Sequence, residues 1–99
     1  MIAKNTLPVN TRNEGDRAFH DLVSRVSLRA DNPDALAAVL RADDFRDEPA
    51  VYDARHHLVD PVRDIHLLAY TSGVLKLFAS SWDVLRPVIT GLAERGQVR

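Results

Sequence analysis

Cysteine is the only amino acid missing altogether from this 99-residue chain. Its absence excludes a disulfide framework, a thiolate zinc site and a cysteine nucleophile. Proteins of reducing compartments commonly lack disulfides, and residues 1–10 contain one lysine but no apolar stretch of the length found in secretory signals. We therefore expect a cytoplasmic protein.

Glycine is also scarce, and the four glycines are too scattered to form a phosphate-binding loop. The sequence contains neither the Gly-x-Ser-x-Gly nucleophile elbow nor the His-Glu-x-x-His zinc motif. No apolar run could span a membrane, because His66, residues 71–73 and Lys76 interrupt the longest one. These absences predict a non-enzymatic protein with no cofactor and no membrane contact.

A basic patch is missing too, and aromatic residues make up only 6% of the chain. Residues 1–30 and residues 65–99 each carry a net charge of +2, whereas residues 31–64 carry nine acidic and four basic groups, a net charge of −5. Proteins that bind nucleic acid neutralise phosphates with clustered Lys and Arg, often interleaved with aromatic rings. The charge distribution therefore argues against a nucleic-acid partner.

The acidic middle segment is the surface that the composition favours for contact with a partner. Acidic groups complement a basic protein electrostatically, and tyrosine is a common interface anchor. The same charges also fit an ordinary solvated surface. Our first hypothesis is a protein-binding module: an adaptor, an inhibitor or immunity-type protein, or a small subunit of a complex. The residues predicted to bind the partner are Asp43, Asp44, Asp47, Glu48, Tyr52 and Asp53.

Histidine and aspartate gather between residues 53 and 66, which raises the alternative of a metal-binding protein or a small metal-dependent enzyme. Neutral imidazoles and carboxylates together suit zinc, iron or manganese. On one helix, His57 and His66 would not face the same side, and adjacent histidines diverge on a helix or a strand. The candidate metal ligands are His56, His57, His66 and Asp60.

The organisation expected is an N-terminal arm over residues 1–13 and one globular domain over residues 14–99. A chain of this length buries only about 65% of the surface that its unfolded form exposes. Surplus apolar surface is then covered by a partner, and a homodimer through residues 61–82 is one arrangement that would do so.

The first half of the domain has the patterns of two helices. Apolar residues recur every three or four positions over residues 14–30, which predicts a helix there. Asn32 is a good N-cap and Pro33 suits the first helical position, so a second helix is expected to end near Ala42. Phe45 follows in a charged connector and is expected to pack into the core.

Residues 51–82 fit two interpretations. As helices, they include a long central helix that begins at Asp60 and Pro61. As strands, they form a sheet with turns at Asp60-Pro61 and at residues 71–73. Leucine and alanine are common in this segment and β-branched residues are few, which favours helices.

The C-terminal residues predict a helix that is capped by Ser81 or Asp83, carries an apolar stripe and ends at Gly96. The fold class expected is mainly α, a single-domain bundle of four or five helices. The alternative is an α+β domain with two N-terminal helices, a short antiparallel sheet over about residues 51–79 and a C-terminal helix.

Overall fold

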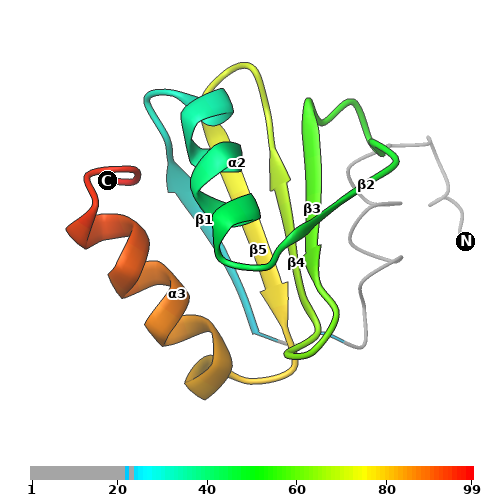
Figure 1. Ribbon diagram of the computed structural model, residues 1–99, viewed down its shortest axis with the longest axis vertical. Coiled ribbons are helices and arrows are strands. Elements are labelled where there is room, and N and C mark those ends of the chain that lie inside the picture. The colour runs from blue at the N-terminus through cyan, green and yellow to red at the C-terminus, as the bar shows by residue number, and fades with distance from the viewer. Residues whose placement is uncertain (1–21, 23) are drawn as a thin grey trace, which may run out of the picture.

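The computed structural model describes residue 22 and residues 24–99. In this part of the chain, five strands form one antiparallel sheet and two helices cover one of its faces (Figure 1). The protein is therefore an α+β domain, and the prediction of a mainly α bundle with four or five helices is wrong. The predicted arm over residues 1–13 lies outside the described residues.

The elements along the chain are β1 (Ser24–Arg29), α2 (Pro33–Ala42), β2 (Arg46–Glu48), β3 (His56–Asp60), β4 (Ile65–Ala69), β5 (Val74–Ala79) and α3 (Trp82–Glu94). The strand order across the sheet is β1-β5-β4-β3-β2, and each neighbouring pair is antiparallel. The first two strands therefore form the two edges, and the three hairpin-connected strands lie between them.

Leucines of the three central strands form the core beneath the helices. Leu58 lies opposite Leu67, which lies opposite Leu77, and all three are fully buried. They belong to the same apolar cluster as Leu40 of α2 and Leu85 of α3. Successive side chains of a strand point to opposite faces, so the neighbours of each leucine in sequence face away from the helices.

The segment predicted as helices between residues 51 and 82 forms β3, β4 and β5, which is the arrangement of the alternative interpretation. Leu67 and Leu68 point to opposite faces and both are buried. A strand that is buried on both faces loses the polar–apolar alternation by which strands are recognised. Its leucine-rich sequence therefore resembled a helix.

The two turns of this region use residues that the sequence had marked. Gly73 has a φ of +94°, and Tyr70 and Val74 close the β4–β5 hairpin through a backbone hydrogen bond of 2.9 Å. Asp60 accepts hydrogen bonds from the backbone N–H groups of Val62 and Arg63. The side chain expected to cap a helix therefore stabilises the β3–β4 turn instead.

Residues 24–29 of the helix predicted over residues 14–30 form strand β1, so the prediction is wrong there. Val26 and Leu28 pack against the core with a period of two, and Arg25 and Ser27 alternate with them. The recurrence of apolar residues every three or four positions, which predicted the helix, depended on residues that precede this strand. Residues 14–21 and 23 of the predicted helix lie outside the described part of the chain.

The two helices with clear end signals are confirmed. The Asn32 side chain accepts a hydrogen bond of 3.0 Å from the Ala35 backbone N–H, and Pro33 occupies the first turn of α2. Ser81 occupies the N-cap position of α3 but its side chain makes no capping hydrogen bond, and Gly96 follows the helix with a φ of +72°. Phe45 is buried as expected. Neither described helix has the length and apolar character needed to cross a membrane.

Two glycines should respond in opposite ways to the same substitution. Gly91 lies inside α3, where an added Cβ meets nothing within 4 Å, so Gly91→Ala should raise the free energy of unfolding by about 0.5–1 kcal/mol. At Gly73 the φ is positive and an added Cβ would lie 3.0 Å from the Ala30 carbonyl oxygen, so Gly73→Ala should lower it by about 1 kcal/mol or more. Urea denaturation measures both changes, and effects of the same sign would contradict the assigned conformations.

Candidate functional site

The sheet separates the histidines that the sequence singled out. His56 lies on the helix-covered side, where its ring contacts Asp34 of α2. His57, the next residue of β3, faces the opposite side together with His66 of β4. In the register, His57 lies opposite Leu68, two residues beyond His66, so the two histidines are diagonal cross-strand neighbours.

The imidazole rings of His57 and His66 lie almost in contact. Their centroids are 5.8 Å apart, the ring planes differ by 30°, and His57 Nε2 lies 3.5 Å from His66 Nδ1. Both residues are partly buried, and 22% of the His66 side chain is exposed. The pair is therefore held by the sheet and still open to solvent.

Hydrogen bonds on the outer side of each ring determine where its hydrogen lies. His57 Nδ1 is 3.1 Å from the carbonyl oxygen of Pro49, which can only accept, so this nitrogen carries the hydrogen. His66 Nε2 is 3.2 Å from Oδ1 of Asp64, and an ionised carboxylate also only accepts. The neutral rings consequently carry their hydrogens on the outer nitrogens.

The two facing nitrogens, His57 Nε2 and His66 Nδ1, therefore both present lone pairs. These nitrogens lie 3.5 Å apart, a separation at which one hydrogen or one metal ion between them would contact both. Two nitrogens bound at about 2.1 Å to one tetrahedral ion lie about 3.4 Å apart, close to the separation seen here. The arrangement thus fits a shared metal ion, and a shared proton would satisfy the same atoms.

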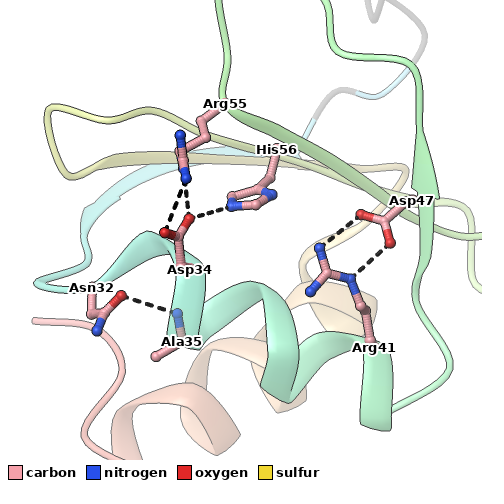
Figure 2. A network of polar contacts seen from close by, with 7 residues as sticks. All are labelled: Asn32, Asp34, Ala35, Arg41, Asp47, Arg55 and His56. Atoms are coloured by element: carbon pink, nitrogen blue, oxygen red, sulfur yellow. Dashed lines mark hydrogen bonds and ion pairs between the residues drawn. The ribbon is translucent and has the colours of Figure 1, made fainter.

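His56 belongs to a different cluster, on the other face of the sheet (Figure 2). Asp34 accepts hydrogen bonds from Arg55 Nε at 2.6 Å and Arg55 Nη2 at 3.1 Å, and its Oδ1 lies 2.7 Å from His56 Nε2. Hydrogen bonds from Arg55 and then His56 lower the pKa of Asp34 to about 2. A guanidinium and an imidazole thus share this carboxylate, which joins α2 to the start of β3.

The fourth candidate ligand, Asp60, lies at the end of β3 and is buried. Burial alone would raise the pKa of Asp60, but hydrogen bonds from the Arg63 side chain and from the backbone N–H groups of Arg63 and Val62 outweigh it and lower the pKa. The structure therefore brings together His57 and His66 but places His56 and Asp60 elsewhere.

Arginine side chains pair with two of the residues predicted to bind a protein partner. Asp47 accepts two hydrogen bonds from Arg41 of α2 (Figure 2), and these lower the pKa of Asp47. Asp43 is paired with Arg95 at 2.7 Å. Tyr52 is half-buried in the loop before β3 and packs against an apolar cluster on the sheet face that bears His57 and His66. The remaining predicted residues, Asp44, Glu48 and Asp53, are exposed.

Two residues of the histidine site were not among the candidate ligands, although Asp64 belongs to the stretch of histidine and aspartate between residues 53 and 66. Asp64 lies two positions before His66, a spacing that brings the two side chains together once the β3–β4 turn is recognised. Pro49 contributes only its carbonyl oxygen, for which the sequence contains no signal. Outer partners of this kind orient the imidazoles that bind metal ions in proteins.

Within the described part of the chain, no group of three or more His, Asp or Glu side chains is placed to hold a metal ion. Compared with family models, curated proteins and solved structures, the chain matches none of them. Functional inference therefore depends on the geometry of the histidine pair itself.

The cluster around Asp34 predicts a specific acid sensitivity. Because the pKa of Asp34 in the folded protein is about 2 and its ordinary value is 3.8, the stabilisation that Asp34 provides is complete above about pH 4 and is lost as the pH falls through 2. Carboxyl-detected NMR titration should give a midpoint near 2 for Asp34 and a higher one in Arg55→Gln. A midpoint that Arg55→Gln leaves unchanged would contradict the assigned ion pair.

Proposed function

We propose that the protein binds a transition-metal ion, with His57 and His66 as its two protein ligands. The observation that carries the proposal is the 3.5 Å separation of His57 Nε2 and His66 Nδ1, each left with a lone pair by the outer hydrogen bond of its ring. The metal would form one coordinate bond with each of these nitrogens.

The donor set defines the class of ion. Imidazole nitrogen suits Zn²⁺, Cu²⁺ and Ni²⁺, whereas Ca²⁺ and Mg²⁺ require oxygen ligands. A given site usually binds Cu²⁺ more tightly than either Ni²⁺ or Zn²⁺. Two protein ligands leave coordination positions for water or for a group from another molecule. Reversible uptake of an ion at an open site is the activity that this donor set supports.

The outer hydrogen bonds give the site rigidity before any ion arrives. Pro49 fixes the His57 ring through Nδ1, and Asp64 fixes the His66 ring through Nε2. A carboxylate on the second nitrogen also makes the ligating nitrogen a stronger donor. Less conformational entropy is then lost when the ion binds.

Calorimetric titration of protein that carries no histidine tag tests the proposal. We expect one Cu²⁺ or Zn²⁺ ion per chain and no binding of Mg²⁺. His57→Ala and His66→Ala should each weaken binding by about 100-fold, because each removes one of two ligands. His56→Ala is the matched control on the opposite face of the sheet and should bind normally. Equal losses in all three variants would contradict the assignment.

Asp64 provides a second test because it acts only through His66. Asp64 has a φ of +55°, which asparagine tolerates, so Asp64→Asn removes the charge without straining the turn. Metal affinity should fall by about tenfold, the lower end of the effect of an outer partner. An unchanged dissociation constant for Zn²⁺ would show that the carboxylate does not support the ligand.

Binding of another protein through the acidic residues remains a prediction, and so does the cytoplasmic location. Ion pairs with arginine already occupy Asp43 and Asp47, which weakens the support for a broad acidic surface. A homodimer through residues 61–82 would have to use the strands and turns of the sheet, since this segment contains β4 and β5.

A further inference from the structure

Strand β1 forms one edge of the sheet, and part of its backbone faces outward. Ala30 donates its backbone N–H to the carbonyl oxygen of Gly73, so alternate residues from Ala30 back to Ser24 bond to β5. The backbone groups of Ser27, in the middle of the strand, therefore point away from the sheet. Ser27 is exposed, and neither its N–H nor its carbonyl oxygen bonds to another of the described residues on this side.

The two edges of the sheet differ in how well they accept a further strand. The opposite edge, β2, has three residues that are all charged and exposed, and short charged strands resist pairing. Strand β1 has six residues, of which four are uncharged. Its last carbonyl oxygen, that of Arg29, already accepts a hydrogen bond of 2.9 Å from the backbone N–H of Arg99. The C-terminal tail thus pairs with the end of this edge rather than with its centre.

Helix α3 adds an apolar flank beside the edge. Leu85 and Leu92 are buried in the core, and Gly91 lines the groove between α3 and α2. Trp82 and Ile89, seven residues apart on one stripe of the helix, lie on the other flank. This flank faces away from α2, and α3 extends past β1 on the side away from the other strands (Figure 1). Ile89 is partly buried, and 43% of Trp82 is exposed.

A strand added to β1 would lie beneath this flank of α3, and its two faces would meet different surroundings. Every second side chain would face α3 and the partly buried Val26 and Leu28, so apolar residues fit there. The intervening side chains would face the other side of the sheet, where β1 bears Arg25 and Arg29. Acidic residues complement these two cations.

We propose that the outer edge of β1 binds an extended segment of a partner protein in which apolar and acidic residues alternate. Hydrogen bonds to the backbone of Ser27 would provide affinity, and the alternating side chains would provide specificity. A second copy of this chain fits less well, because its own helices would enter the space into which α3 extends (Figure 1). This interaction goes beyond metal binding, since β5 separates β1 from the strands that carry His57 and His66.

NMR titration of the ¹⁵N-labelled full chain with synthetic peptides tests the proposal. The first probe is a blocked hexapeptide of alternating valine and glutamate, and the second has lysine in place of glutamate. The glutamate peptide should cause saturable shifts at the Ser27 amide and slow its exchange with solvent. The amide of Asp47, which points outward from β2 at the other edge, should not change. The lysine peptide should bind at least about tenfold more weakly, because like charges would lie across from each other.

Matched variants separate the backbone contact from the apolar flank. Ser27→Pro removes the outward N–H and leaves the ladder between β1 and β5 complete, so it should abolish binding, whereas Ser27→Thr should retain it. Trp82→Gln should weaken binding by at least about tenfold. Val62→Gln changes the other exposed large apolar side chain of the described residues and should bind normally. This second pair of variants decides the outcome even if Ser27→Pro does not fold.

Four results would overturn the proposal. They are the absence of saturable shifts, equal affinities of the glutamate and lysine peptides, normal binding by a folded Ser27→Pro, and equal effects of Trp82→Gln and Val62→Gln. Protection of the Ser27 amide that rises with protein concentration in the absence of peptide would show that a second copy occupies the edge, which would also overturn a foreign segment.

Discussion

The antiparallel register of β3 and β4 decides where every candidate group of this protein lies. Leu58 and Leu67 lie opposite each other and enter the core beneath the helices. Because side chains alternate along a strand, the same register sends His57 and His66 to the other face as diagonal neighbours. A slip of one residue in either strand would turn its leucine away from the core beneath the helices. The stability of the core therefore holds the two imidazoles in place.

Arginine side chains form ion pairs with acidic residues of the middle segment, residues 31–64. Arg55 binds Asp34 at the start of α2, Arg41 at its end binds Asp47 of β2, and Arg95 links α3 to the residue after α2. Exposed ion pairs of this kind add little to stability, but they fix the orientation of a helix on a sheet. Arg95 lies outside residues 31–64, so its pair with Asp43 offsets part of the net charge of −5 in that segment.

Local chemistry allowed parts of the fold to be predicted from the sequence, and long-range pairing accounts for the failures. The cap at Asn32, Pro33 in the first turn and Gly96 after α3 act within a few residues, so both helices could be located. The central strands were predicted only in the alternative interpretation, because β4 is buried on both faces and lacks polar–apolar alternation. The site also depended on both local and long-range features. Residue type made His57 and His66 candidates, but only the pairing of β3 with β4 brings them together. The Pro49 carbonyl directly follows β2, and its position beside His57 depends on the pairing of β2 with β3.

The tautomers of His57 and His66 determine whether the pair offers two lone pairs to a cation. Long-range ¹H–¹⁵N NMR correlations of the metal-free protein, recorded above about pH 8 where histidine is ordinarily neutral, identify the protonated nitrogen of each ring. The hydrogen bonds to Pro49 and Asp64 predict hydrogen on Nδ1 of His57 and on Nε2 of His66. Hydrogen on Nε2 of His57 or on Nδ1 of His66 would contradict a preformed site for a metal ion.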